Sequence, residues 1–584
     1  MAKIFIAKSA ANAGKVMYQS EAWPTASSSI NDNTDIDNVV ASVAQDGDTV
    51  VLDGGTYSGT ELDATEGVDT SMAITLRGAN STDPDYTSHN AIPVIFSGAG
   101  LSDHTLSVAA NGQTIEDIEI NGNVADGYRA VTISNSSGSE KDITFNRVKC
   151  KDNANDTGHS ACFGMANANQ VNVYLNDCEC TDNSASDSTC FYSSVDTNWY
   201  IDGGTFSRNT TIPGTAKTGG VAYLNHATDA GNVVVITGAT FSDNKSSSSA
   251  SVFYVNKGID MTITNTVISD NIADYYDLDG GVAGGAIRFG NFLTTGVTKT
   301  LTVTNCTIDG NKLKVAAGET GDGGQIWLGG YDTLNRVTAN FTNTIISNGF
   351  GNLGGGIYYS VFSQGTVDRC QFLYNTARSG AGALRRGGEA EANQGLLTVV
   401  KNSVFIGNRC GYEYDGETLS TVLADGGAID VRHYPRMILE NCSFFNNTAI
   451  QHGDSFSANE EAFGEFTSDE QRNELYNNVF YGIGALEEIW CEGTATLSAA
   501  NNAAAADKMN FGGVTATGTI TLTADPFHDT ALRLPSGSPL VKTGKVLALR
   551  GLDIAGQPVM RGRKMNVGAY ADHLGAAATR NPRV

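Results

Sequence analysis

Residues that could perform acid–base chemistry gather in the stretch DVRHYPR, residues 430–436, and around residues 385–389. A polysaccharide lyase needs a base such as arginine, lysine or histidine and a cation that neutralises the uronate, whereas a hydrolase needs two carboxylates with separate roles. Strand alternation points Arg386 inward, where a charge requires a salt bridge or a local bulge. No acidic pair recurs on successive repeats, so the sequence leaves open whether the protein is an enzyme. The candidate catalytic residues are Arg385, Arg386, Asp430, Arg432 and His433.

A second candidate site is a row of aromatic and arginine side chains at one position of a repeated phrase. Such side chains bind glycans by ring stacking and paired hydrogen bonds, and they are also enriched in protein–protein interfaces. Stacking of one ring on the next, or burial beneath loops, is the alternative without a ligand. We expect the row to project from one face of one sheet, about 4.8 Å per step, and to be covered by a partner chain or a glycan. The candidate binding residues are Tyr192, Tyr223, Tyr254, Arg288, Trp327, Tyr358 and Arg385.

These positions belong to a chain built of repeats. An eleven-residue phrase that ends in asparagine reads VYLNDCECTDN at residues 173–183 and VVITGATFSDN at 234–244, and its copies recur about 26 to 40 residues apart. Apolar and polar residues alternate within each copy, which predicts a strand. Large apolar side chains such as Phe405 recur three positions before the asparagine, and small ones such as Cys306 and Cys442 recur five positions before it. Both columns are expected to point inward, and the final asparagines are expected to bond between coils at a left-handed turn.

A second phrase, GGAIRF at residues 284–289 and GGAIDV at 426–431, alternates with the first. The pairing of Phe-x-x-Asn with Gly-Gly-Ala-Ile resembles the repeats of chlamydial polymorphic outer membrane proteins and of other right-handed β-helix proteins, over roughly residues 110–450. The resemblance implies an all-β fold, a right-handed single-stranded parallel β-helix with at least two strands in each coil. It is specific for fold and says little about function.

Three regions follow from this pattern. An N-terminal cap or attachment segment spans residues 1–46, the parallel β-helix spans 47–490, and a C-terminal β-rich capping segment with a tail spans 491–584. Within the cap, DIDNVVASVA at 35–44 predicts a short amphipathic helix. The closing segment, which includes NVGAY at 566–570, resembles that of bacterial β-helix surface proteins and lyases.

Composition narrows the classes of partner. The net charge of −26 and the pI near 4.6 argue against nucleic acid and against an anionic membrane surface. At least six of the ten cysteines occupy the two inward columns, so they are expected to be buried, unbridged core residues. No Cys-x-x-Cys or combined His and Cys spacing indicates zinc or a redox motif.

No cofactor is expected, with calcium as the open possibility. The acidic residues Asp274, Asp277 and Asp279 could hold Ca²⁺ through oxygen ligands. The sequence has neither EF-hand nor nonapeptide calcium spacing, so the metal assignment stays open.

The N-terminal residues 1–15 lack the apolar segment of a signal peptide, and no apolar run is long enough to cross a membrane. A β-helix without an export signal is typical of a phage virion protein, which leaves the cell by lysis; a chain with its signal removed is the alternative. We therefore expect a structural virion protein, a fibre, tail spike or capsid-decorating β-helix, that contacts other virion or surface subunits or host glycans. A homo-oligomer and a bound polysaccharide are both compatible with the sequence.

Two other functions stay open. One is a polysaccharide lyase or depolymerase that acts on surface polysaccharide, and the other is a glycan-binding bacterial surface adhesin. The expected location is the virion for the first hypothesis, and the extracellular space or the cell surface for the alternatives.

Overall fold

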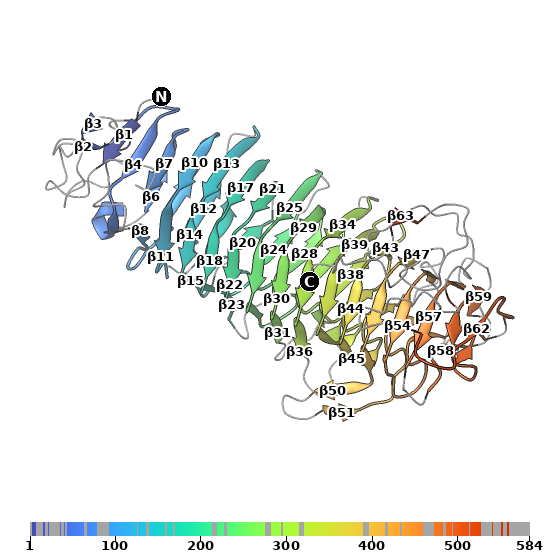
Figure 1. The fold of residues 1–584 in the computed structure, drawn as a ribbon. Helices are drawn as coiled ribbons and strands as arrows, with labels where there is room; N and C mark the ends of the chain where they lie inside the picture. The colour runs from blue at the N-terminus through green and yellow to red at the C-terminus, as the bar shows by residue number, and fades with distance from the viewer. Residues whose placement is uncertain are drawn as a thin grey trace. The chain divides into compact units, whose positions relative to one another are not determined.

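Strands dominate the computed structural model, and its coils stack within each of two compact units (Figure 1). The first unit comprises Met1–Thr262 with Tyr276–Leu278, and the second comprises Ile263–Tyr275 with Asp279–Val584. The structure describes residues 3–6, 16–17, 21–22, 36, 40, 44–62, 67–78, 93–124, 127–135, 139–157, 160–166, 170–194, 196–212, 219–226, 231–274, 282–293, 296–314, 321–388, 396–414, 419–432, 435–459, 472–482, 486–492, 495–512, 514–526, 540, 551–552 and 558–559.

The first sheet takes one strand from each coil, and its neighbours pair in parallel. In the first unit its strands are β1 (Lys3–Ile6), β4 (Thr49–Leu52), β7 (Thr75–Gly78), β10 (Gln113–Glu116), β13 (Lys141–Asn146), β17 (Val171–Asn176), β21 (Thr197–Asp202), β25 (Asn232–Thr237) and β29 (Ile259–Thr264), at whose end the second unit begins. In the second unit they are β34 (Lys299–Thr304), β39 (Val337–Thr342), β43 (Ser363–Asp368), β47 (Leu397–Lys401), β53 (Arg436–Glu440), β56 (Asn473–Tyr476) and β59 (Thr496–Ala500).

The second sheet follows immediately along each coil and is also parallel. In the first unit its strands are β5 (Gly55–Ser58), β8 (Val94–Ser97), β11 (Ile118–Asn121), β14 (Lys149–Lys151), β18 (Glu179–Thr181), β22 (Thr205–Ser207) and β26 (Thr240–Ser242). In the second unit they are β30 (Val267–Ser269), β35 (Thr307–Asp309), β40 (Ile345–Ser347), β44 (Gln371–Leu373), β48 (Val404–Ile406), β54 (Ser443–Phe445), β57 (Val479–Tyr481), β60 (Ala503–Ala504) and β62 (Ile520–Thr521).

The third sheet closes each coil and carries the Gly-Gly-Ala-Ile phrase. In the first unit its strands are β6 (Val68–Thr70), β9 (Leu106–Val108), β12 (Val131–Ser134), β16 (Phe163–Ala166), β20 (Phe191–Ser193), β24 (Ala222–Asn225) and β28 (Phe253–Lys257). In the second unit they are β33 (Ile287–Asn291), β38 (Ile326–Gly330), β42 (Ile357–Tyr359), β46 (Leu384–Arg386), β52 (Ile429–Arg432), β55 (Phe456–Asn459), β58 (Ile489–Cys491) and β61 (Met509–Asn510).

Short strands between the second and third sheets form a fourth sheet. They are β15 (Ala154–Asn155), β19 (Ser184–Ala185), β23 (Thr210–Thr211) and β27 (Lys245–Ser246) in the first unit, and β31 (Ile272–Asp274), β36 (Lys312–Lys314), β41 (Phe350–Leu353), β45 (Thr376–Gly380) and β49 (Arg409–Cys410) in the second. Further short elements are β2 (Val16–Met17), β3 (Glu21–Ala22), η2 (Gly59–Leu62), β32 (Val282–Ala283), β37 (Gly321–Asp322), β50 (Tyr412–Tyr414), β51 (Leu419–Thr421), β63 (Gly551–Leu552) and β64 (Pro558–Val559).

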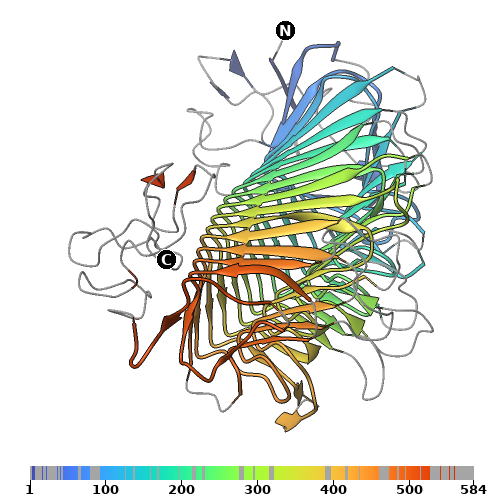
Figure 2. The same cartoon turned by 90° about the vertical axis from the view of Figure 1, so that its right-hand side faces the viewer.

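This strand pairing confirms the prediction of an all-β parallel β-helix, and Figure 2 shows the coils of each unit stacked strand on strand. Equivalent positions of the repeated phrase pair directly, as Cys150 does with Cys180 and Phe405 with Phe444. Pairing continues to β62, beyond the predicted boundary at residue 490. Ile36 and Val40 of the predicted cap are helical and buried. Among the described residues, no helix has the length and apolar character needed to cross a bilayer.

Each eleven-residue phrase forms two strands joined by a tight corner. In the copy at residues 173–183 the corner residue Asp177 has φ of 51°, and Asp182 has φ of 59° at the second corner. Asparagine and aspartate tolerate this left-handed conformation better than most other residues with a Cβ atom. The left-handed residue is therefore the one before the final asparagine, not the asparagine itself as predicted.

The final asparagines form a buried ladder, as predicted. The backbone N–H of Asn153 donates to Asn183 Oδ1 at 3.1 Å, and Asn183 Nδ2 donates to the Cys150 carbonyl at 3.0 Å and to Asn209 Oδ1 at 2.9 Å. A ladder with the same pattern links Asn375, Asn408 and Asn447 in the second unit. These bonds satisfy polar groups at the coil corners that would otherwise be buried without partners.

The two inward columns fill the core. In the second unit Phe372, Phe405 and Phe444 stack with ring centroids 4.7 and 4.6 Å apart. In the small column Cys306 and Cys442 are buried and unbridged, and each Sγ donates to a backbone carbonyl. The same holds for the buried thiols of Cys178 and Cys370, which confirms the expectation for this column.

One coil of the second unit lacks its ladder asparagine and replaces it from another segment. Its phrase ends with glycine at Gly349, and the side chain of Gln325, the residue before β38, occupies the gap. Gln325 Oε1 accepts from Asn311 Nδ2 at 2.7 Å, and Gln325 Nε2 donates to Asn375 Oδ1 at 3.1 Å. The amide of Gln325 therefore keeps the ladder continuous across this coil.

Replacing Gln325 with alanine should lower the free energy of unfolding by about 2 kcal/mol, because donors and acceptors of two buried ladder asparagines lose their partner. Urea unfolding followed by circular dichroism would measure the change. Gln371→Ala, on a half-buried position of β44, is the matched control and should change stability by less than about 0.5 kcal/mol. Equal midpoints for the two variants would contradict the bridging role of Gln325.

Candidate functional site

The predicted row of aromatic and arginine residues lies at one register position of the third sheet. In the first unit Tyr192 pairs with Tyr223, and Tyr223 pairs with Tyr254. The ring centroids of these two pairs are 5.6 and 5.4 Å apart. Arg129 lies over the Tyr192 ring at 5.8 Å and extends the stack by a cation–π contact.

In the second unit the row continues through five strands. Arg288 pairs with Trp327, Trp327 with Tyr358, Tyr358 with Arg385, and Arg385 with Asp430. Arg288 lies 5.3 Å from the Trp327 ring and Arg385 lies 5.7 Å from the Tyr358 ring. Alternation along each strand separates this row from the core-facing isoleucine and leucine residues.

The expectation that the row is exposed was wrong for four of its five aromatic members, whereas Tyr223 is half-buried. Trp327 is only 6% exposed and Tyr358 only 8%, and Tyr192 and Tyr254 are equally covered at 9%. Over Trp327 the cover comes from the same chain, because Phe292 stacks on the indole with ring planes 8° apart.

Nearby groups explain how this cover packs so closely. Leu353 and Ala283 pack against the same aromatic cluster as Trp327 and Tyr358. Gly329, two residues beyond Trp327, lacks a side chain, and the indole lies where its Cβ would be. Trp327 and Tyr358 therefore belong largely to an internal layer, and the partner chain or glycan expected to cover the row stays a prediction.

The charged end of the row is an ion-pair network. Arg432 donates through Nε to both carboxylate oxygens of Asp430, at 3.2 and 3.0 Å, and through Nη2 to Asp425 at 2.7 Å. Arg385 Nε lies 3.8 Å from Asp430 Oδ2. The structure thus brings three of the predicted catalytic residues together, and it places the Asp430 carboxylate out of contact with solvent.

Arg386 points into the core, as predicted, and among the described residues its guanidinium is held by backbone carbonyls. Its Nη1 donates to the carbonyls of Tyr359, Ser360 and Gly387 at 3.0 to 3.2 Å, and its Nη2 donates to Ser363 at 2.6 Å. Burial lowers the pKa of Arg386 to about 9, so the guanidinium still carries its charge at neutral pH. His433 and the nearby Glu389 lie outside the described residues.

Two carboxylates that the sequence analysis missed lie beside the next strands of the third sheet. Burial raises the pKa of Glu488 to about 7, and burial also raises that of its neighbour Asp454. The Ser455 hydroxyl donates to Glu488 Oε2 at 2.5 Å. The ring of His452, which precedes β55, stacks on that of Trp490 of β58 with centroids 4.5 Å apart. A carboxyl that stays protonated near neutral pH is the chemical requirement for a general acid.

The signal for these residues is their departure from the repeat. Where other coils read Gly-Gly-Ala-Ile, these coils read Gly-Asp-Ser-Phe at residues 453–456 and Glu-Glu-Ile at 487–489. Of the predicted calcium ligands, Asp274 ends β31, whereas Asp277 and Asp279 lie outside the described residues. The calcium assignment therefore stays a prediction.

No family model matches the chain, and no curated protein matches it. Among solved structures the chain is similar to one titled "Crystal structure of pectate lyase Pel9A", with 10% identity, a TM-score of 0.21, and coverage of 98% of this chain and 97% of that chain. A TM-score this low carries no argument, so the assignment of fold rests on the strand pairing described above. The chain is an all-β parallel β-helix protein.

Proposed function

We propose that this protein is a structural component of a phage virion, a β-helical fibre, spike or capsid decoration that contacts other virion subunits or host surface glycans. The asparagine ladder and the stacked phenylalanines support a mechanical role, because both repeat the same contact from coil to coil within each unit. Stability in such a solenoid accumulates from neighbouring coils.

The observation that carries the proposal is that the candidate catalytic arginines already bind carboxylates and backbone carbonyls of the same chain. Arg432 binds Asp430 and Asp425, and Arg386 donates to four backbone carbonyls. A lyase base must accept a proton from the substrate, and a guanidinium held by acceptors in this way stays protonated. In this proposal Arg386 and Arg432 act as structural ties.

Mass spectrometry of intact particles purified from the native source tests the proposal directly. The protein should copurify with capsid proteins at a fixed ratio through a density gradient. Recovery only from the cell envelope would contradict the virion location and favour the adhesin, which binds a glycan without cleaving it. A glycan array probed with the pure protein would then identify the bound sugar.

A polysaccharide depolymerase is the second candidate, and the carboxyl pair of Glu488 and Asp454 favours it. Both groups have raised pKa values, and the stacked rings of His452 and Trp490 provide an aromatic surface in the same two coils. Incubation of the pure protein with capsular polysaccharides, followed by assays for reducing ends and for unsaturated uronates, distinguishes the two functions. Release of either product that disappears in Glu488→Gln would overturn the structural proposal.

Independently of catalysis, Glu488 should make stability depend on pH. Its pKa rises from an ordinary 4.5 to about 7 on folding, so the folded state binds more protons between these values. The stabilisation is complete below about pH 4.5 and is lost as the pH rises through 7, a change on the order of 3 kcal/mol. Thermal unfolding across this window should show the decline in the wild type and a much flatter profile in Glu488→Gln. Parallel profiles would show that Glu488 ionises normally in the folded protein.

A further inference from the structure

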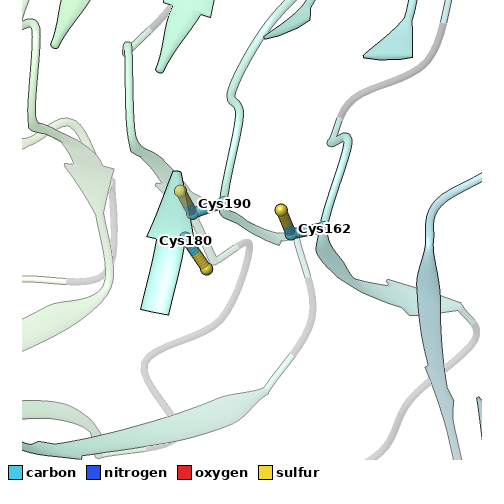
Figure 3. A group of neighbouring side chains, drawn as sticks. All are labelled: Cys162, Cys180 and Cys190. Carbon is cyan, nitrogen blue, oxygen red and sulfur yellow. The ribbon is translucent and has the colours of Figure 1, made fainter. Parts of the chain in front are cut away.

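Four cysteines of the first unit converge in its core. Cys150 and Cys180 pair directly on β14 and β18, and Cys162 and Cys190 immediately precede β16 and β20. The Sγ atoms of Cys162, Cys180 and Cys190 all lie within 4.8 Å of one another, and Figure 3 shows these three side chains gathered from neighbouring segments. All four side chains are fully buried and unbridged. Two successive coils, and two sheets within each coil, therefore supply one sulfur cluster.

The clustered thiols differ from lone buried thiols in their hydrogen bonds. Cys178 and Cys306, for example, donate to backbone carbonyls, whereas the hydrogen bond of Cys190 is with a neighbouring hydroxyl, Thr189 Oγ1, at 3.7 Å. Cys162, Cys180 and Cys190 thus face one another in the core, which distinguishes them from ordinary small core residues.

Burial in the core opposes the charged thiolate form of all four side chains. The thiolate is the form of cysteine that binds metals. The positive charge of a metal ion among the four sulfur atoms would stabilise this form at every position.

We propose that Cys150, Cys162, Cys180 and Cys190 form a buried structural site for one thiophilic metal ion, with Zn²⁺ as the ion that fits best. A tetrahedral site with Zn–S bonds of about 2.3 Å needs sulfur atoms about 3.8 Å apart. Three of the sulfur atoms already lie within 4.8 Å of one another, and Cys150 pairs with Cys180 on the neighbouring strand, from which rotation of its side chain would supply the fourth. Four thiolates and no other ligand are the donor set of structural zinc.

Two stacked disulfides are the competing use of the same residues. Neighbouring parallel strands about 4.8 Å apart bring the Cα atoms of Cys150 and Cys180 within the range that a disulfide spans. Disulfides would, however, join sulfur atoms in two separate pairs and would need an oxidant. The mutual proximity of Cys162, Cys180 and Cys190 favours a shared central ligand over separate pairs.

The location also predicts when the ion enters. Because every ligand is sealed inside the coils, the metal must be acquired while the first unit folds, with release of the thiol protons to solvent. The bound ion would cross-link two coils and two sheets from within. It would therefore stabilise the folded protein far more than it would affect any surface activity.

Metal analysis of protein produced with added Zn²⁺ is the first test, with an expected content of one ion per chain. Refolding from denaturant with Co²⁺ should produce the intense charge-transfer and visible bands of tetrahedral thiolate ligation. Cys162→Ser and Cys190→Ala should each reduce the zinc content at least tenfold, whereas Cys306→Ala, at a lone buried thiol, should retain the full content. Copper(I) in place of zinc at the same stoichiometry would confirm the site and reassign the ion.

Counting the free thiols of the wild-type protein tests the site without relying on variants that fail to fold. Wild-type protein denatured with a chelator should titrate all ten cysteines as free thiols, and refolding with Zn²⁺ should raise the unfolding temperature above that of refolding without it. Folded wild-type protein that contains no metal and shows ten free thiols would overturn the proposal. A shortfall of two or four thiols would overturn it in favour of disulfides.

Discussion

Replacement of Arg386 with methionine should lower the free energy of unfolding by about 4 kcal/mol. Methionine keeps much of the apolar volume but donates no hydrogen bond, so the carbonyls of Tyr359, Ser360 and Ser363 that Arg386 now serves would be left buried without that donor. Arg386→Lys should recover only part of the loss, because a single ammonium cannot reach carbonyls arranged around a planar guanidinium. Chemical denaturation monitored by tryptophan fluorescence would measure the series.

Arg409→Ala is the matched control for this series, because Arg409 lies on the adjacent coil with its side chain in solvent. Its effect should stay within about 0.5 kcal/mol. If Arg386→Met were as stable as wild type, the carbonyls would have found other hydrogen-bond donors, and the fold would not need the guanidinium. If it were more stable, burial of the charge would outweigh its hydrogen bonds.

The phenylalanine stack should be almost as sensitive. Phe405→Ala removes a fully buried ring between Phe372 and Phe444, whose centroids lie 4.7 and 4.6 Å away. The loss of burial and the resulting cavity should lower the unfolding free energy by about 4 kcal/mol. Phe405→Leu, which fills most of the same space, should lose about 1.5 kcal/mol or less.

Ile406→Ala, one residue along the same strand, controls for strand propensity because its half-buried side chain points away from the core. Its effect should be under about 1 kcal/mol. Similar losses at the two positions would mean that the strand, and not the stacked rings, determines stability here. Hydrogen exchange would locate the weakened coil, since solenoid repeats contact mainly their neighbours.

Much of the fold could be predicted because its determinants are local and repeated. Alternation placed Phe405 and Cys442 in the core, and the recurring asparagine at positions such as Asn183 indicated a ladder. The replacement of one ladder asparagine by Gln325 is also marked in the sequence, because the copy that ends at Gly349 lacks its asparagine. Such features depend only on the register between adjacent coils.

The candidate site was less predictable because its environment depends on contacts between distant segments. Alternation gives the face on which Trp327 lies, but it does not reveal that Phe292 folds over the ring. Glu488 gives no repeated signal in the sequence, because it departs from the pattern that the other coils share. The approach of Cys162 to Cys180 likewise depends on how the second and third sheets face each other across a coil, which no spacing along the chain encodes.

The asparagine ladder makes the spacing between neighbouring coils independent of the number of residues in a coil. Bonded ladder residues are 26 positions apart at Asn183 and Asn209 but 40 apart at Asn271 and Asn311, yet the hydrogen bonds are alike. Extra residues therefore enter between strands, where lengthening a loop adds little entropy loss, and the stacking of the sheets is unchanged. Related chains can therefore differ in whole loops while the spacing between their coils stays the same. The same property makes the chain a natural display scaffold, on which foreign peptides could be mounted at regular intervals.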